Sequence, residues 1–486
     1  MRPESLGALD SVFVTMDAPN APLHVGALIE LEAPAGVMVN PEQRFAKIRE
    51  RIEERLSSMA VLRRRVVRAP FDLGQPVLVD DPDFDLDFHI VRRAVPAPGG
   101  PAEVDTLVAR VMANPLAPDR PMWELSVIEG LAGGRTALLV KIHHALADGV
   151  SGVMVFAGLF DLEPHAPASP QGEVLDEGPV PPVPTPFEML SRSSSELLRR
   201  PGAVLEALGT SLNRLATKVD ELVAGHEAQV ALGHDANLFE APSTTLSGTI
   251  SHARRFGRLE LSLSEVKAAA RRHGGTVTDF AMSITGGAVQ RLLEERGEAP
   301  AKDLVAFVPV NIRIPGTEGD LGNRITARLV PLDSTVEDFS KRMDKVVARS
   351  KAVKAAPEPS TDLVNDLAEA AGPALSSLAG RVVSAFELFD LLPQGANCIV
   401  SSVPGPPVPL WCAGEKIVRV APMGPLMFNQ GINVTLLSYC DTVEFGILMC
   451  AKRVPDAERF VALLAEEAEV LLAEPLARAD SAASSA

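Results

Sequence analysis

A Pro-rich, acidic stretch at residues 163–186 (EPHAPASPQGEVLDEGPVPPVPTP) is the feature that most restricts the fold of this chain. Proline lacks a backbone N–H and has a fixed φ, so neither a regular helix nor a central strand runs through such a stretch. The chain has 486 residues, more than one hydrophobic core normally organises. We therefore expect an N-terminal domain over 1–180 that ends in this linker, a helical connecting segment over 181–240, a C-terminal domain over 241–475 and a disordered tail over 476–486.

Strand-like and helix-like segments alternate on both sides of the Pro-rich stretch. Before it, 24–31 (HVGALIEL) and 135–142 (RTALLVKI) are short β-rich runs, whereas 42–58 and 103–114 have helical spacing. After it, we expect strands at 254–260, 304–310, 396–402, 416–421, 431–440 and 443–450, and helices at 263–273, 279–294, 361–391 and 455–473. This alternation predicts an α/β or α+β layered architecture.

Charge and cysteine content exclude some classes of protein. The net charge is −17, from 46 basic and 63 acidic residues, which argues against a nucleic-acid-binding protein. The four cysteines (398, 412, 440 and 450) form no C-x-x-C pair and are expected to be buried free thiols in a reducing cytoplasm. The N-terminus (MRPESLGALDSVFVTMD) has no secretory-signal pattern, and no apolar run is long enough to span a bilayer. We expect a cytoplasmic protein, soluble or peripherally associated with a membrane.

The segment KIHHALADGVSG at 141–152 carries the strongest chemical signal. An apolar strand ends there, His143 and His144 follow, and Asp148 and Gly149 come next. A neutral imidazole can take a proton from a hydroxyl at physiological pH, and glycine permits a tight turn or a close approach of substrate. An acyl transfer to an alcohol needs such a base and a donor that stabilises the oxyanion. The pattern therefore suggests a general base.

Other interpretations of the two histidines remain open at this level. They could simply end a strand, with one ring buried and hydrogen-bonded. A zinc site is disfavoured because the spacing is not H-E-x-x-H and no cysteine is nearby. A serine nucleophile is disfavoured because the G-x-S-x-G motif is missing from the sequence.

The segment HHALADG matches the H-H-x-x-x-D-G motif of the chloramphenicol-acetyltransferase-like superfamily, which includes peptide-synthetase condensation domains. Several further segments occur in the order typical of one branch of it. By these motifs the chain resembles the bacterial wax ester synthase/diacylglycerol acyltransferase family over nearly its whole length. The matching segments are LDSVFVTMDAPNAPLHVGALIEL (9–31), DPDFDLDFHI (81–90), PLAPDRPMWELSVIEGLAGGRTALLVKIHHALADG (115–149), VPVNIR (308–313), GNR (322–324) and SSVPGP (401–406).

This resemblance implies two chloramphenicol-acetyltransferase-like domains that form a pseudo-dimer with a central channel. It implies direct transfer of a long-chain acyl group from acyl-CoA to diacylglycerol, giving triacylglycerol, or to a long-chain alcohol, giving a wax ester. Acyl-CoA would then be a co-substrate, with no permanently bound cofactor and no metal, and the protein would contact a membrane or lipid-droplet surface. Two alternatives remain: a polyketide or glycolipid O-acyltransferase of the same superfamily, and a catalytically idle lipid-binding protein.

The resemblance also assigns roles to residues of the histidine motif. His144 matches the general base, and His143 is its structural partner. Asp148, followed by Gly149, matches the motif aspartate that pairs with an arginine, and Arg313 or Arg324 is the expected partner.

Further residues are implied to line the substrate site. Trp123, in the segment Pro121–Met122–Trp123, matches a Pro-Leu-Trp motif, although packing is the more ordinary role for a tryptophan. Thr278 and Ser402 stand where the family tends to have asparagine. The complete expected set is Trp123, Asn311, Arg313, Thr278, Asp279, Ser401 and Ser402.

Two surface features suit the implied substrates. Arg63, Arg64, Arg65 and Arg68 form the densest basic run and could bind the phosphates of CoA, or they could be a solvated helix end. An apolar stripe within 205–222 could lie on a lipid surface, although core packing is the commoner fate of such stripes. The stripe consists of Leu205, Leu208, Leu212, Leu215, Val219 and Leu222.

Overall fold

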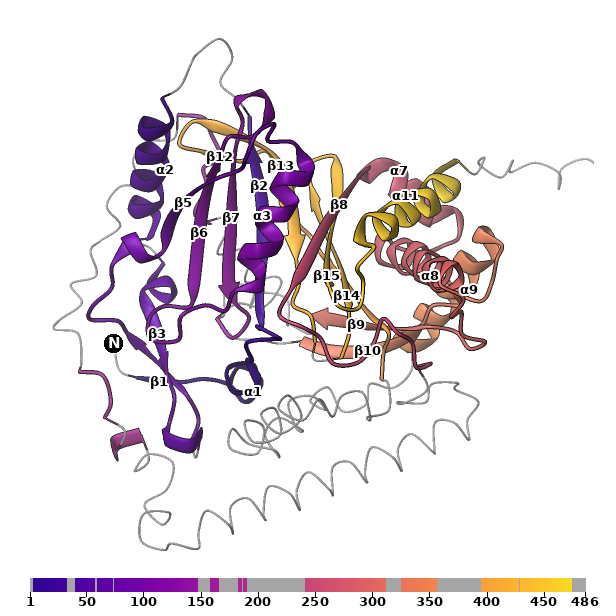
Figure 1. Cartoon of the computed structure of the whole chain (residues 1–486), viewed down its shortest axis with the longest axis horizontal. Helices are drawn as coiled ribbons and strands as arrows, with labels where there is room; N and C mark the ends of the chain where they lie inside the picture. The colour runs from indigo at the N-terminus through magenta and orange to yellow at the C-terminus, as the bar shows by residue number, and fades with distance from the viewer. Residues whose placement is uncertain are drawn as a thin grey trace, which may run out of the picture.

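The computed structural model describes residues 3–32, 40–56, 59–72, 74–146, 158–165, 182–185, 187–189, 241–311, 325–355, 395–427 and 429–473. In these residues two six-stranded sheets stand side by side, and a small three-stranded sheet lies beside the first (Figure 1). The expected helical segments at 205–222 and 361–391, the linker except for 163–165 and 182–185, and the tail lie outside the described residues. The mixed α/β prediction is confirmed.

The first sheet has the strand order β12-β13-β2-β7-β6-β5. Its centre is the antiparallel pair β2 (His24–Leu31) and β7 (Thr136–His143), in register from His24 opposite His143 to Leu31 opposite Thr136. Every residue of β7 is buried, as its apolar run predicts. The sheet is completed on one side by β6 (Trp123–Glu129) and β5 (Ile90–Ala94), and on the other by β13 (Glu415–Met423) and β12 (Trp411–Cys412).

Three helices accompany this sheet. α2 (Pro41–Leu56) buries Ile48 and Ile52, which are four residues apart on one helix face. α3 (Pro101–Ala113) packs against β2 and also against β8 of the second sheet. α1 (Ala8–Met16) lies below the lower end of β7 in the view of Figure 1. The small sheet has the order β1-β4-β3, with β1 at Glu4–Ser5, β4 at Val77–Asp80 and β3 at Arg64–Val67.

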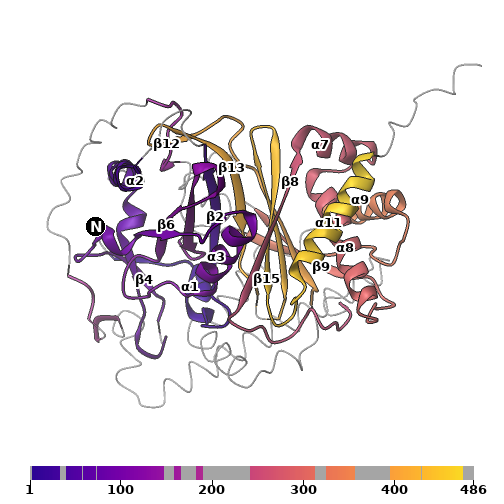
Figure 2. The same cartoon turned by 45° about the horizontal axis from the view of Figure 1, so that its top comes forward.

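The second sheet has the order β10-β9-β11-β14-β15-β8. The helices described in this half of the chain gather on one side of it (Figures 1 and 2). The strands are β8 (Arg254–Ser262), β9 (Val305–Asn311), β10 (Ile325–Pro331), β11 (Cys398–Val403), β14 (Ile432–Tyr439) and β15 (Thr442–Cys450), and the helices are α7 (Leu263–Arg272), α8 (Val277–Glu295), α9 (Phe339–Ala355) and α11 (Ala457–Ala473). The expected strands and helices that fall in this region are confirmed to within a few residues.

Strand pairing crosses the expected domain boundary. β12 and β13 belong to the last quarter of the chain, but β13 pairs with β2 and so completes the first sheet. The core of that sheet accordingly includes Ile417, Ala421 and Met423 beside residues of β2 and β7. The two halves are therefore joined by a shared hydrophobic core, and the division of the chain at residue 240 stays a prediction.

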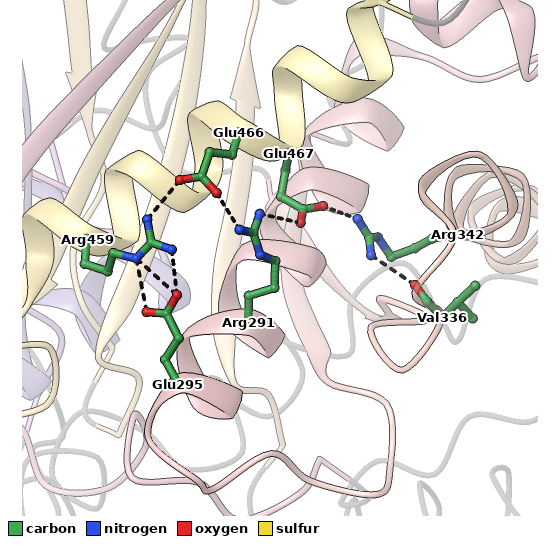
Figure 3. A network of polar contacts seen from close by, with 7 residues as sticks. All are labelled: Arg291, Glu295, Val336, Arg342, Arg459, Glu466 and Glu467. Carbon is green, nitrogen blue, oxygen red and sulfur yellow. Dashed lines mark hydrogen bonds and ion pairs between the residues drawn. The ribbon is translucent and has the colours of Figure 1, made fainter.

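An ion-pair network fastens the helices of the second sheet (Figure 3). Arg291 of α8 contacts Glu466 and Glu467 of α11, and Glu467 also pairs with Arg342 of α9. Glu467 is fully buried, and burial raises its pKa. Arg459 of α11 extends the network to Glu295 of α8 at 2.6 Å. Because buried ions require partners, this network fixes how the three helices pack.

No helix within the described ranges is long and apolar enough to cross a membrane. All four cysteines are free; Cys398, Cys412 and Cys450 are buried, as expected, and Cys440 is partly exposed.

Candidate active site

The two histidines of the motif lie where β7 ends. His143 is the last residue of the strand, and His144 begins the turn that follows. Because side chains alternate along a strand, His143 faces the same side of the sheet as Lys141. The motif residues Asp148 and Gly149 lie outside the described residues, as do Arg313 and Arg324, so their expected roles stay predictions.

The His144 side chain is half-buried and held in a defined orientation. Its backbone N–H donates to the carbonyl oxygen of Leu23 at 2.9 Å. Its ring stacks on Phe13 of α1, with 4.3 Å between ring centroids and 19° between the planes. Phe13 is itself largely buried. The position that sequence reasoning assigns to a base is therefore partly open to solvent and rigidly supported.

His143 is buried, with a side chain only 3% exposed. Its Nδ1 accepts a hydrogen bond from the backbone N–H of Ala145 at 3.2 Å. In the neutral ring an accepting Nδ1 leaves the proton on Nε2, which faces Asp17 Oδ1 at 3.8 Å. His143 therefore shapes the turn that carries His144, and this geometry is compatible with the structural role expected of it.

The loop between α1 and β2 holds the backbone of His144 in place. Asp17 Oδ1 accepts a hydrogen bond from the backbone N–H of Leu23 at 2.7 Å, which closes the loop between them. Arg254, at the start of β8, donates to the carbonyl oxygen of Asn20 in the same loop at 2.7 Å. Arg254 is buried, and burial lowers its pKa to about 10. Residues from both halves of the chain thus fix the loop whose Leu23 carbonyl holds His144.

The face of β2 and β7 that carries His143 also anchors the C-terminal end of α3. Lys141 is almost fully buried, and its Nζ donates to the carbonyl oxygens of Val111 at 3.1 Å and Asn114 at 2.8 Å. Nε2 of His24 lies 2.8 Å from the carbonyl oxygen of Met112. The last carbonyls of a helix lack intrahelical partners and attract positive charge, so these contacts satisfy them. Burial lowers the pKa of Lys141 to about 8 and the pKa of His24 well below its usual value.

Trp123 begins β6 and lies in the core. It is 3% exposed, and its Nε1–H donates to the carbonyl oxygen of Leu62 at 2.7 Å. One face of its ring stacks on His89 at 4.5 Å. These contacts account for a packing role, and the expected substrate contact stays a prediction.

The remaining expected residues belong to the second sheet and its helices. Thr276 is the N-cap of α8, and Asp279 completes the capping box: its Oδ2 accepts from the backbone N–H and the hydroxyl of Thr276, both at 2.8 Å. Thr278 follows Val277 in the first turn of the same helix and is half-buried.

Ser401 and Ser402 lie in β11, and Asn311 ends β9. Ser401 is half-buried, Ser402 is exposed, and the side chain of Asn311 is not described. These residues belong to strands of the second sheet, whereas His144 follows a strand of the first, and their substrate contacts stay predictions.

The basic run at 63–68 is largely engaged within the protein. Arg64 is buried and pairs with Glu4 at 2.7 Å, whereas Arg68 binds Asp72 through two hydrogen bonds of 2.8 and 2.7 Å. Arg65 donates to the carbonyl oxygen of Asp119 at 3.0 Å. Only Arg63 of the four is exposed, so the run is a weaker candidate for CoA phosphates than its sequence suggests.

Sequence reasoning quoted the segment 9–31 as a motif but assigned no role to Phe13, Asp17 or His24. The only available signal was their position at or just before the start of the strand β2, because the contact with the histidines arises from pairing with a strand more than 100 residues away.

Comparisons with known proteins concern the family and the fold of the chain. Residues 6–281 match the wax ester synthase/diacylglycerol acyltransferase catalytic domain, and residues 321–471 match the C-terminal domain of the same family. A probable diacylglycerol O-acyltransferase of Mycobacterium tuberculosis is 31% identical over 90% of this chain and 88% of its own length. The structure resembles the wax ester synthase/diacylglycerol acyltransferase of Marinobacter aquaeolei VT8 with a TM-score of 0.68 and 25% identity, over 96% of this chain and 98% of that one.

The fold also extends to peptide-synthetase proteins. The first condensation domain of the calcium-dependent antibiotic synthetase matches with a TM-score of 0.55 and 17% identity, over 98% of both chains. At that identity the match concerns the fold alone.

Proposed function

Since this chain belongs to the wax ester synthase/diacylglycerol acyltransferase family, whose members are acyl-CoA-dependent O-acyltransferases, we propose that it transfers a long-chain acyl group from acyl-CoA to a lipid hydroxyl, with His144 as the general base. The acceptor is diacylglycerol or a long-chain alcohol. The single observation that most supports the role of His144 is its placement: a half-buried imidazole at the end of a fully buried strand, held by Phe13 and Leu23.

The proposed reaction is a direct transfer without an acyl-enzyme. His144 takes the proton of the acceptor hydroxyl while the hydroxyl oxygen attacks the thioester carbonyl carbon. The tetrahedral intermediate then collapses, the C–S bond breaks, and the imidazolium returns the proton to the CoA sulfur. General-base catalysis of this kind typically contributes about 10²–10⁴-fold.

Phe13 has a place in this proposal. The ring of His144 becomes a cation when it holds the proton, and the face of an aromatic ring stabilises an adjacent cation. The stacked contact at 4.3 Å would thus favour the protonated form that exists only during the reaction.

The other motif residues complete the proposed site. His143 shapes the turn, while Asp148 pairs with Arg313 or Arg324 and Gly149 allows the turn to close. Acyl-CoA is a co-substrate, and no permanently bound cofactor is required by this chemistry.

We further propose that the protein meets its acceptor at a lipid surface, because diacylglycerol and long-chain alcohols are almost insoluble in water. The apolar stripe within 205–222 is the proposed contact. Replacing Leu208 and Leu215 with Glu should yield a folded protein that no longer sediments with lipid vesicles. Loss of folding would instead assign the stripe to the core.

The function is tested by measuring CoA release from palmitoyl-CoA with dioleoylglycerol, hexadecanol or no acceptor. Release that depends on either lipid, with formation of the matching triacylglycerol or wax ester, is the expected result. Release only with a polyketide or sugar alcohol would assign the chain to another branch of the superfamily. A folded protein that is inactive with every acceptor would overturn the enzymatic proposal.

A further inference from the structure

Phe13 of α1 and Asp17, the C-cap residue of that helix, face the two histidines of the motif. Phe13 and Asp17 are four residues apart, so they lie on the same side of the helix end. Phe13 stacks on the ring of His144, and the carboxylate of Asp17 faces Nε2 of His143. The mechanism above uses Phe13, but it leaves a partly buried carboxylate beside the histidine pair without a role.

Asp17 acts on the backbone of His144 through one residue. Its Oδ1 accepts the N–H of Leu23 at 2.7 Å, and the carbonyl oxygen of that same residue accepts the N–H of His144 at 2.9 Å. The loop between them is tightened by a further backbone hydrogen bond from Ala21 to Ala18 at 2.9 Å. Displacement of Leu23 would therefore move the backbone of His144 directly.

Asp17 also acts on His143. Nδ1 of that ring accepts the N–H of Ala145, which fixes the proton on Nε2. The Asp17 carboxylate lies 3.8 Å from Nε2 and favours the tautomer in which this atom carries a proton. The side chain of Asp17 is 26% exposed, whereas that of His143 is 3% exposed, so the carboxylate is the solvated end of a buried pair.

We infer that Asp17 is a positioning residue for acyl transfer, which holds His143 in one tautomer and thereby fixes the turn that presents His144. The inference rests on the proposed role of His144. The contacts of Asp17 with Leu23 and His143 both act on the histidine motif, so no contact with a substrate is assigned to Asp17. A carboxylate that served only to close the loop would not need to face a histidine ring.

The test is a double-mutant cycle between Asp17 and His143. Asp17→Ala removes both contacts, and His143→Asn keeps an acceptor near the position of Nδ1 but removes the atom that faces Asp17. Asp17→Ala should lower kcat by up to about 10²-fold, the effect of misplacing a catalytic group by roughly 1 Å, with the KM for acyl-CoA unchanged. The double variant should be much less impaired than the product of the two single effects.

Two further variants distinguish a positioning role of Asp17 from a general loss of folding. Asp17→Asn retains an oxygen for the Leu23 N–H but loses the charge, so it should fold even if the alanine variant does not, and its kcat should lie between those of Asp17→Ala and the unaltered chain. Asp161→Asn is the matched control, because Asp161 is a carboxylate paired with the buried Arg51 and the half-buried Arg55, and neither of these partners belongs to the histidine motif. It should lower the melting temperature and leave kcat intact.

The outcomes separate the inference from the function. Non-additive loss in kcat with an unchanged KM supports a positioning role. The inference would be overturned if the effects of the Asp17 and His143 substitutions were additive, or if Asp17→Ala and Asp17→Asn left kcat unchanged. In either case an inactive His144→Ala variant would still uphold the proposed function. Full activity in His144→Ala would instead refute the assignment of the base, whatever the cycle gave.

Discussion

Replacing Arg258 with Met should weaken the contact between the two sheets and lower the free energy of unfolding. Arg258 of β8 has a side chain only 4% exposed, and it pairs with Glu30 of β2 at 2.5 Å and with Asp105 of α3 at 2.8 Å. It thus joins the second sheet to the first at a point where α3 packs on β8. Figure 1 shows α3 next to β8 at this junction. The two carboxylates are 5% and 20% exposed, so both are largely removed from water where they meet this guanidinium.

The expected loss follows from leaving buried carboxylates without their partner. Breaking a buried ion pair by removing one member costs about 3–5 kcal/mol. Glu30 retains Arg135 at 2.7 Å, which moderates the loss there. Among the described residues Asp105 has no ion pair with a second arginine. Burial already raises its pKa to about 6 with Arg258 present. We therefore expect a loss of roughly 3 kcal/mol in the free energy of unfolding at pH 8.

The loss should depend on pH in a defined direction. A carboxyl group whose folded pKa exceeds its unfolded pKa binds more protons in the folded state between those two values, so stability falls as pH rises through that window. Removing Arg258 raises the pKa of Asp105 further and extends the window upward from about pH 4 past pH 6. The variant should therefore be much closer to the unaltered protein at pH 5 than at pH 8.

Urea unfolding at both pH values measures this difference, with the unaltered protein compared at each pH. Arg92→Met is the matched control, because Arg92 pairs with Glu129 at 2.9 Å but is 40% exposed. Exposed ion pairs contribute about 0–1 kcal/mol, so this control should lose little at either pH. A loss below 1 kcal/mol for Arg258→Met, or an equal loss at pH 5 and pH 8, would refute the reasoning.

Three other substitutions test roles assigned above. Trp123→Phe should lower the free energy of unfolding by about 1–3 kcal/mol, because the carbonyl of Leu62 loses its donor, and leave kcat nearly unchanged; a collapse of activity at unchanged stability would show substrate contact instead. Asp279→Ala should destabilise the protein by about 0.5–1.5 kcal/mol through loss of the hydrogen bond from the Thr276 N–H in the α8 capping box, as measured by urea unfolding, without altering the KM for acyl-CoA. Phe13→Leu should lower kcat by roughly 2- to 30-fold, the rate equivalent of a cation–π contact of about 0.5–2 kcal/mol at His144, and an unchanged kcat would remove that contact from the mechanism.

The central strands β2 and β7 could be predicted from the sequence because each is indicated by the residues of its own segment. β2 was predicted at its observed bounds, and β7 to within one residue, since both are short β-rich runs; every residue of β7 is buried, and every residue of β2 except the half-buried Val25. α1 was not predicted, because ALDSVFVTM is only nine residues long and its β-branched residues favour strand over helix. Its helical form therefore depends on packing with residues such as Phe13, which a local pattern does not reveal.

Long-range pairing accounts for the other differences. The insertion of β13 beside β2 joins segments almost 400 residues apart, and no periodicity in either segment specifies its neighbour. The same limit applies to the site. The histidine pair could be located by its motif, but the contact of His143 with Asp17 depends on how α1 meets the end of β7.

The central claim is tested most directly by comparing triacylglycerol formation from palmitoyl-CoA and dioleoylglycerol in the unaltered chain and in His144→Ala. The account predicts that the variant melts at nearly the same temperature and forms product about 10²–10⁴-fold more slowly at saturating substrate. A folded His144→Ala variant that forms triacylglycerol at close to the unaltered rate would contradict the assignment of the base.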